Sequence, residues 1–354
     1  MTLFKQIATV ALITLMSLES TTAPQAAQPD KNFNPANTVT LGDNPATSFR
    51  NFAPELAQTI ARMPKIDPQT GLYVAEIEPG LFYVTEGVYQ SAFLVTDTGI
   101  TLFDAPPSFA YKLPGILAQY APGKPIEYLI YSHGHNDHIG GSGVFADIPG
   151  LKIVASAEIA RMIGENGRPG ILRPTDTFED SYKLTLGTQP VELKTAAFHS
   201  EQGDVIIYLP KLKFLIAVDT ITPGEVPFMN FGGTSDMGGY LTMFDTLLAY
   251  DFDTIMSGHI SILGNRNDLI LARDYTYDVR DTVLKSMADF YGRFESTLAK
   301  MDYQNPNLAY RAAMEMVRDD CADEIINRWS DRLSVVDVWA DSHCETVVMY
   351  SIMH

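Results

Sequence analysis

The feature that most constrains this chain is a turn that carries three histidines and an aspartate within six positions. These residues are His133, His135, Asp137 and His138, and they follow an apolar run, 126–131, whose length and β-rich content predict a buried strand. His133 and His135 are two apart in extended chain and should point to the same side, while Asp137 and His138 lie one turn further on. The turn can therefore offer ligands to two metal ions about 3.5–4 Å apart, the spacing in two-metal hydrolytic sites.

The alternative is that these histidines are hydrogen-bonded structural residues, as a single histidine in a protein usually is. The clustering favours a metal site, because three of the seven histidines in the chain lie in this one turn. Two others, His199 and His259, each lie at the end of an apolar run. Neutral imidazole and carboxylate at strand ends are good ligands for Zn²⁺ and its neighbours.

The charge of the chain argues against nucleic-acid binding. The formal net charge is -18, whereas nucleic-acid binding draws its affinity from clustered lysines and arginines. With 354 residues, of which 46% are hydrophobic, the chain can bury a large core. It can do so as one large domain or as one domain with an appendage.

The N-terminus has the pattern of a signal peptide. Lys5 is followed by an apolar run at 7–18 and by small residues at 21–23. The run is shorter than the roughly 20 residues that span a bilayer. We therefore expect a signal peptide at 1–27, cleaved between residues 23 and 27, a periplasmic or secreted location, and no membrane attachment afterwards. An ordinary amphipathic N-terminal helix is the alternative.

Export bears on the two cysteines, Cys321 and Cys344. In an oxidising compartment they could pair, and the bridge would then staple only the C-terminal segment of the chain. Spacing alone leaves open whether their Cα atoms come within bonding range.

The order of predicted elements indicates two sheets packed face to face with helices outside. Strands are predicted at 81–84, 89–95, 100–104, 126–131, 152–155, 182–186, 191–198, 204–209, 213–218 and 254–257. Helices are predicted at 54–63, 108–119, 137–145, 158–163, 239–250, 269–301, 307–328 and 342–353. The expected segments are the signal peptide at 1–27, an N-terminal arm at 28–71, a central domain at 72–265 and a helical extension at 266–354.

Two loops are candidates for a substrate site. The segment 164–177 is rich in Gly, Pro and Asn, and it either borders the site or is a plain surface loop. The segment 222–236 is apolar and rich in Gly and Pro, and it either walls a pocket or packs as a cover. We favour the pocket, because ligand pockets are mostly apolar. The expected wall residues are Val226, Phe228, Met229 and Phe231.

Taken together, these residues resemble the metallo-β-lactamase superfamily. The motif of that family is HxHxDH after a strand, followed by a lone His, a lone Asp and a final His, each at a strand end. The matching residues here are His133, His135, Asp137, His138, His199, Asp219 and His259. The resemblance covers residues 72–263 and implies a four-layer αββα sandwich, with the C-terminal helices as an extension. Asp104 matches an aspartate that ends an earlier strand in the family and supports the ligands from behind.

The resemblance implies a binuclear centre. One metal would bind His133, His135 and His199, the other would bind Asp137, His138 and His259, and Asp219 would bridge them. Each metal keeps an open position, as in catalytic sites. A metal-bridging hydroxide would attack an acyl carbonyl, one metal would stabilise the oxyanion, and Asp137 would pass a proton toward the leaving group. Zinc is the expected metal, with manganese or iron as alternatives, because His/Asp sites accept all three.

Departures from individual branches of the family narrow the expected reaction. True β-lactamases carry Cys or Ser near the place of Asp219, and flavin-linked diiron oxidoreductases carry Glu where this chain has His135. A bridging Asp is shared by glyoxalase II-like thioesterases, homoserine lactone-cleaving lactonases and RNA-processing enzymes. Many of the lactonases also carry a Tyr where this chain has Thr222. The acidic charge and the expected export disfavour RNA and cytoplasmic thioesters.

We therefore expect a metal-dependent hydrolase that cleaves an ester or lactone of a small, partly apolar molecule with little or no charge. The alternatives within hydrolysis are a thioester or a β-lactam. In another class, the alternatives are a non-hydrolytic iron dioxygenase of the same fold or a metal-binding protein without turnover. The expected partner is a small-molecule substrate and not a nucleic acid, and the C-terminal helices are a candidate surface for a homo-oligomer.

Overall fold

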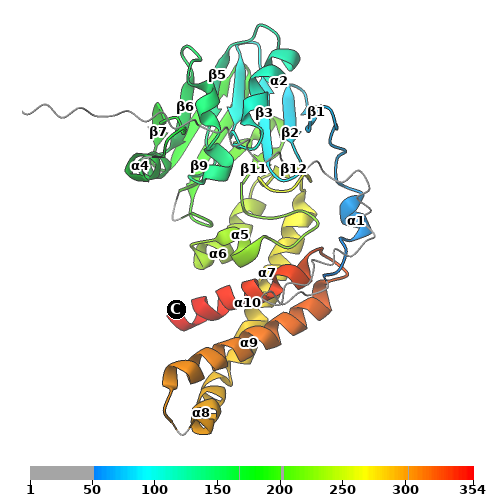
Figure 1. Ribbon diagram of the computed structural model, residues 1–354. Helices are drawn as coiled ribbons and strands as arrows, with labels where there is room; N and C mark the ends of the chain where they lie inside the picture. The colour runs from blue at the N-terminus through cyan, green and yellow to red at the C-terminus, as the bar shows by residue number, and fades with distance from the viewer. Residues whose placement is uncertain (1–51, 167, 201–202, 302) are drawn as a thin grey trace, which may run out of the picture.

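Residues 52–354, except 167, 201, 202 and 302, are described by the computed structural model (Figure 1). The expected signal peptide at 1–27 and the first part of the expected arm lie outside the described residues. Within the described part of the chain, no helix combines the length and the apolar character needed to cross a bilayer.

Seven strands form the first sheet, in the order in which they occur along the chain. They are β1 (Tyr73–Glu78), β2 (Leu81–Thr85), β3 (Gln90–Val95), β4 (Ile100–Phe103), β5 (Ile126–Ile130), β6 (Lys152–Ser156) and β7 (Asp176–Phe178). Neighbours from β1 to β4 pair antiparallel, and neighbours from β4 to β7 pair parallel. Because β4 and β5 are parallel, the residues that follow them, Asp104 and the histidine turn, meet at one edge of the sheet.

Five strands form the second sheet, in the order β12-β11-β10-β9-β8. They are β8 (Ser181–Leu186), β9 (Gln189–Ala196), β10 (Asp204–Leu209), β11 (Phe214–Ile216) and β12 (Thr254–Met256). β11 and β12 are the parallel pair of this sheet. Asp219 and His259 follow these two strands and therefore lie at one edge as well.

The two sheets face each other across an apolar core, and helices cover their outer faces (Figure 1). Helices α2 (Leu113–Tyr120) and α4 (Ala157–Asn166) contribute buried side chains to the core of the first sheet. Helix α6 (Met237–Leu248) packs with β10 and β11 on the other side of the second sheet. This arrangement confirms the predicted αββα sandwich.

The short elements are where the structure departs most from the sequence prediction. They are α1 (Ala57–Ile60), the 3-10 turns η1 (Ala110–Lys112), η2 (Ser142–Phe145) and η3 (Pro210–Leu212), and the short helices α3 (Asn136–Ile139) and α5 (Met229–Gly233). The predicted helix at 54–63 is reduced to α1, and the one at 137–145 is divided between α3 and η2. β1, β7 and α5 were not predicted, because three- to six-residue segments carry little periodicity.

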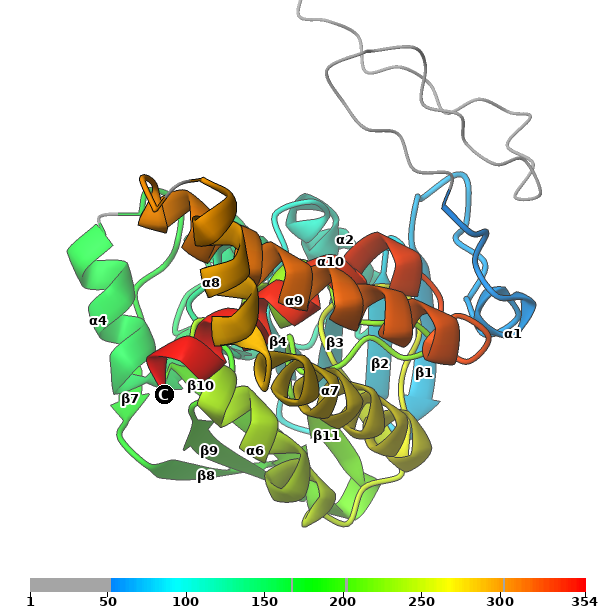
Figure 2. The same ribbon diagram turned by 90° about the horizontal axis from the view of Figure 1, so that it is seen from below.

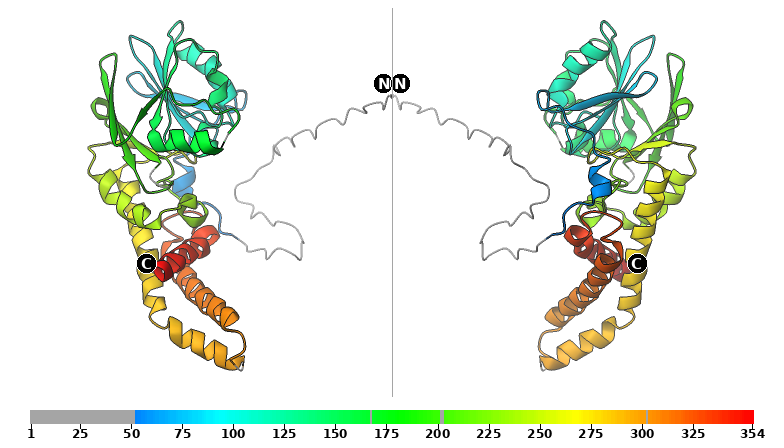
Figure 3. Two further views of the ribbon diagram at one scale, coloured as in Figure 1. Left: turned by 90° about the vertical axis from the view of Figure 1, so that its left-hand side faces the viewer. Right: turned by 90° about the vertical axis from the view of Figure 1, so that its right-hand side faces the viewer.

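The C-terminal region consists of α7 (Arg266–Met287), α8 (Phe290–Lys300), α9 (Pro306–Trp329) and α10 (Val336–Met353). The single helix predicted at 269–301 is wrong, because the chain breaks into α7 and α8. Figures 1 and 3 show these helices at one end of the sandwich, with α8 and α9 reaching farthest from the sheets, and Figure 2 shows the molecule from that end. They share a hydrophobic core with α6 and the second sheet. A disulfide between Cys321 and Cys344 joins α9 to α10.

Candidate metal centre

Residues that follow β4 hold the histidine turn, residues 131–141, at both ends. The Asp104 carboxylate accepts a hydrogen bond from the Ser132 backbone N–H at 2.8 Å. The Ala105 backbone N–H donates to the His138 carbonyl, also at 2.8 Å. Asp104 is buried, so it acts from behind the turn, in the place that the sequence predicted for it.

Two aspartates of the site turn the chain sharply where strands end. Asp104, after β4, and Asp219, after β11, both have left-handed backbone conformations, with φ of 59° and 61°. Such conformations are uncommon outside glycine and concentrate at functional sites. Beside them, Gly258 has a φ of 90°, and a Cβ there would lie 2.4 Å from the side chain of Val218. The loop that carries His259 can therefore approach Val218 this closely only because residue 258 is glycine.

Two buried polar side chains hold the remaining histidines, and the sequence prediction identified neither as a site residue. The Asp204 carboxylate accepts a hydrogen bond from the His199 backbone N–H at 2.8 Å. The Gln90 amide donates to the His259 carbonyl at 3.0 Å and accepts from the Gly258 N–H at 3.0 Å. Buried polar groups need such partners, so Asp204 and Gln90 fix these two loops to strands β10 and β3.

His133, His135, His199 and Asp219 form a first group of side chains that can hold a metal ion. The Oδ2 atom of Asp219 lies 3.2 Å from His133 Nε2 and 3.7 Å from His199 Nδ1. The ring of His135 lies 4.6 Å from that of His133 and 4.8 Å from that of His199, centroid to centroid. The three imidazoles therefore converge on one side of the Asp219 carboxylate.

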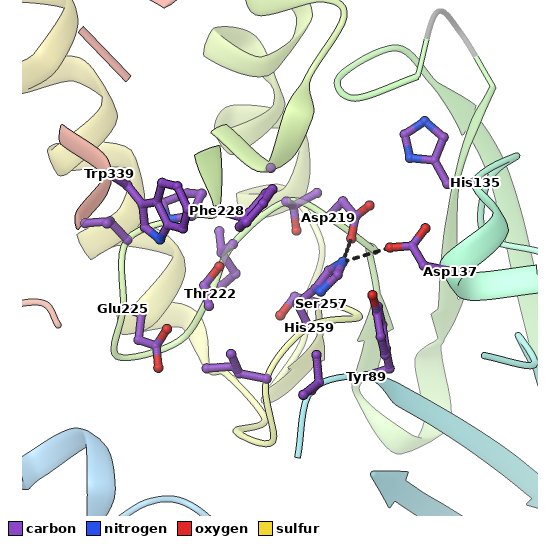
Figure 4. A pocket seen from close by; sticks show the side chains of 17 residues that line it. Tyr89, His135, Asp137, Asp219, Thr222, Glu225, Phe228, Ser257, His259 and Trp339 are labelled. Atoms are coloured by element: carbon purple, nitrogen blue, oxygen red, sulfur yellow. Dashed lines mark ion pairs between the residues drawn. The ribbon is translucent and has the colours of Figure 1, made fainter. Parts of the chain in front are cut away.

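Asp137, His138 and His259 form a second such group. The Oδ2 atom of Asp137 lies 3.5 Å from His138 Nε2 and 3.6 Å from His259 Nε2. Figure 4 shows His259 with the carboxylates of Asp137 and Asp219 directed at its ring. Asp137 and His259 are partly exposed, with side-chain exposures of 38% and 32%, so solvent reaches this second group.

Asp219 connects the two groups. Its Oδ2 faces His133 and His199, while its Oδ1 lies 3.1 Å from His138 Nε2 and 3.0 Å from His259 Nε2. One carboxylate thus presents one oxygen to each group, as a metal-bridging residue does. All seven residues singled out in the sequence are brought together at this point.

The electrostatics of the site suit cation binding. Burial would raise the pKa of Asp219, but the imidazoles of His138 and His133 outweigh that effect and hold the pKa well below its ordinary value. Burial, together with His133 and His199, lowers the pKa of His135 to about 4. An ionised carboxylate and a neutral imidazole are the forms that bind metals.

The donor atoms also fit metal ions. Several buried nitrogen and oxygen atoms have no hydrogen-bond partner among the described residues; they include His133 Nε2, His199 Nδ1 and Asp219 Oδ1. Leaving such atoms unpaired is unfavourable. His138 Nε2 and His259 Nε2 lie only 3.1 Å apart, so both nitrogens are close enough to bind the same cation. Nitrogen and oxygen donors of this kind suit zinc, manganese and iron alike.

A cavity of about 370 Å³ opens onto this centre. Its lining contains His135, Asp137, Asp219 and His259 from the ligand groups, together with an apolar wall. Of the four expected wall residues, Val226 and Phe228 line the cavity. Phe231 is instead fully buried in the core, where it stacks on His343 at 4.3 Å, and Met229 is not part of the lining.

The loop at 164–177 has a different place from the one considered for it. Helix α4 extends to residue 166 and β7 begins at 176, so the loop is shorter than expected. None of its described residues lines the cavity. Its Arg168 side chain donates instead to the Gly134 carbonyl, so the loop supports the histidine turn from outside.

Helix α10 contributes to the cavity, which the sequence did not predict. Trp339 lines it and contacts Phe228, with ring centroids 4.7 Å apart. His343 lies one helical turn further along and pairs through Nε2 with the Phe228 carbonyl at 3.2 Å and through Nδ1 with the Tyr275 hydroxyl at 2.7 Å. The C-terminal extension is therefore part of the pocket wall.

Comparison with known proteins bears on the family. A model described as the metallo-beta-lactamase superfamily matches residues 85–259. This range contains every member of both ligand groups. The chain belongs to the metallo-β-lactamase superfamily. Within that superfamily, a centre built from these seven side chains is that of a metal-dependent hydrolase.

Two curated relatives match parts of this superfamily member. The 2,4-dinitroanisole O-demethylase subunit alpha of Nocardioides sp. (strain JS1661) is 27% identical over 186 residues, which are 52% of this chain and 56% of the relative. A UPF0173 metal-dependent hydrolase of Pyrococcus abyssi (strain GE5 / Orsay) is 40% identical over 76 residues, which are 22% of this chain and 32% of that protein. The chain thus spans about half or less of the length of these relatives.

Solved structures share the fold. A metallo-beta-lactamase from Pontibacter korlensis superposes with a TM-score of 0.50 at 20% identity, covering 57% of this chain and 97% of that one. The stereoselective inverting sec-alkylsulfatase of Pseudomonas sp. superposes with a TM-score of 0.56 at 17% identity, covering 80% of this chain and 50% of that one. At these identities the likeness concerns the metallo-β-lactamase fold alone.

Proposed function

We propose that the protein is a binuclear metal-dependent hydrolase that cleaves an ester or lactone of a small, partly apolar molecule. The observation that carries this proposal is the position of Asp219, which presents one oxygen to each ligand group at the end of a partly apolar cavity. The cavity volume is within the range of small-molecule sites.

The ligand groups would hold two cations, which activate a water as the nucleophile and polarise the substrate carbonyl. One cation would be held by His133, His135 and His199. The other would be held by Asp137, His138 and His259, and Asp219 would contact both cations. Asp137 is the ligand carboxylate nearest to solvent, so it can accept a proton from the attacking water and pass it to the leaving group. Tyr89 lines the cavity beside His259, at 5.0 Å between ring centroids, and would orient the bound substrate.

The reaction is distinguished from its alternatives by a substrate panel. The panel contains lactones, aryl esters, thioesters, a cephalosporin, phosphodiesters and 2,4-dinitroanisole, the last because of the name of one relative. We expect turnover to be highest on lactones or esters, since a protein with a net charge of -18 repels anionic substrates such as phosphodiesters. Highest turnover on phosphodiesters would contradict the proposal, and stoichiometric iron with oxygen consumption would favour a dioxygenase.

Phe228→Ala tests the wall of the cavity. We expect kcat/KM on the best ester to fall about tenfold without loss of metal, because a lost pocket contact typically contributes about 1–3 kcal/mol. The matched control is Met229→Ala, since Met229 is also exposed but does not line the cavity. Equal losses in the two variants would exclude Phe228 as a specific contact.

We also propose that the protein is exported to the periplasm or secreted. The apolar N-terminal segment supports this proposal, and so does the Cys321–Cys344 disulfide, because structural disulfides persist mainly in oxidising compartments. Intact-mass measurement of protein from a periplasmic or culture fraction should show a chain that lacks the first 23 to 27 residues. A full-length cytoplasmic species would refute export.

A further inference from the structure

The cavity has a second charged end, opposite the candidate metal centre. Figure 4 shows Glu225 and Trp339 on one side of the cavity and Asp219, Asp137 and His259 on the other. Backbone contacts hold Glu225 in place. Its N–H donates to the Thr222 carbonyl at 2.9 Å, and its backbone forms an isolated β-bridge with Ser334. Glu225 is therefore a fixed part of the lining that the metal chemistry does not use.

The Glu225 carboxylate has no hydrogen bond or ion pair within the described part of the chain, and no described Lys or Arg lines the cavity. Burial, and then the nearby Glu55, raises the pKa of Glu225 to about 7. A half-buried carboxylate of this kind is destabilised in its charged form until a cation reaches it.

Aromatic rings lie in the same part of the cavity. Phe228 and Trp339 form an inclined pair, with an interplanar angle of 60°, and both line the cavity near Glu225 (Figure 4). Aromatic faces beside a carboxylate are the surroundings that bind ammonium and quaternary ammonium groups. The net charge of -18 further favours cations over anions near this surface.

We infer that Glu225, Trp339 and Phe228 form a subsite for an amine or quaternary ammonium group of the substrate. This inference rests on the proposed function, because it places that cation at the end of the cavity remote from the bond to be cleaved. It revises the sequence-based expectation of a substrate with little or no charge. The preferred ester or lactone has an apolar middle and a positively charged end.

Binding without turnover is the first test. Choline and its uncharged analogue 3,3-dimethylbutan-1-ol are titrated calorimetrically into the metal-loaded enzyme, and the fluorescence of Trp339 is followed as a second signal. We expect choline to bind at least about tenfold more tightly, a difference of about 1.4 kcal/mol. Glu225→Gln should abolish this preference, whereas Glu55→Gln, which removes a nearby exposed charge outside the lining, should retain it.

Equal affinity for the two ligands in the wild type would overturn the subsite. An equal loss of the choline preference in Glu225→Gln and Glu55→Gln would also overturn it, because the preference would then come from the overall negative charge of the protein. Trp339→Phe should keep most of the choline preference and Trp339→Leu should lose it, which provides a second route if Glu225→Gln fails to fold.

Hydrolysis of a charged ester and of its uncharged analogue tests the subsite and the proposed ester hydrolysis separately. Acetylcholine and 3,3-dimethylbutyl acetate differ only in charge, and we expect a KM about tenfold lower for acetylcholine. Hydrolysis of both esters with equal KM would overturn the subsite and leave ester hydrolysis standing. Selective, Glu225-dependent choline binding without hydrolysis of either ester would support the subsite and count against ester hydrolysis.

Discussion

Asp219→Ala should lose at least one metal ion per chain and reduce turnover by roughly 10³-fold, since a two-metal centre supplies several kcal/mol of transition-state stabilisation. Its two oxygens face different ligand groups, and no other described carboxylate faces both. Removing it also leaves four imidazoles close together without their central anion. Metal content and kcat measured on the same purified sample check the prediction.

The matched control for this variant is Asp251→Ala. The side chain of Asp251 is exposed, and its partner among the described residues is Lys213 at the surface, so its loss should change neither metal content nor turnover. Circular dichroism of both variants establishes that each is folded. If Asp219→Ala kept two metal ions and full activity, Asp219 would not be the bridging residue.

Truncation after Ala340 should unfold the C-terminal helical region, α7 to α10. It removes most of α10, including the buried Val347 and Val348, and it breaks the disulfide to Cys321. Burial of each valine contributes about 1.5–3 kcal/mol, and a disulfide typically about 2–4 kcal/mol. The combined loss, about 5–10 kcal/mol, is comparable to the whole stability of a typical domain.

Thermal melting and oligomeric mass measure this effect. The control is a chain shortened by Met353 and His354 alone, because Met353 is 71% exposed and should contribute little. Retention of the melting temperature after the longer truncation would show that α10 is dispensable. A change in mass with an unchanged melting temperature would instead indicate that α10 forms a subunit interface.

The metal ligands and the fold were predictable because their signals are local. Each ligand lies in a short segment that begins where an apolar run ends, and the spacing of the histidine turn restricts what it can bind. Alternation of strands and helices was enough to predict two sheets with helices outside. The matching order of His199, Asp219 and His259 along the chain then restricted the family.

The residues that hold those ligands were not predictable, because their role depends on contacts between distant strands. Gln90 reaches a loop about 170 residues later, and nothing near Gln90 in the sequence indicates that partner. The pocket wall was only partly predicted for a similar reason. Left-handed backbone at Asn230 and Phe231 turns Phe231 into the core, and Trp339 completes the wall from a helix that the family pattern does not include.

The metal content of the wild-type protein tests the binuclear centre most directly. Inductively coupled plasma mass spectrometry of the purified chain, with protein concentration from amino-acid analysis, should give two metal ions per chain. Chelation should remove both ions and the ester hydrolysis together, and adding the metal back should restore both. One ion or none in a fully active enzyme would contradict the account.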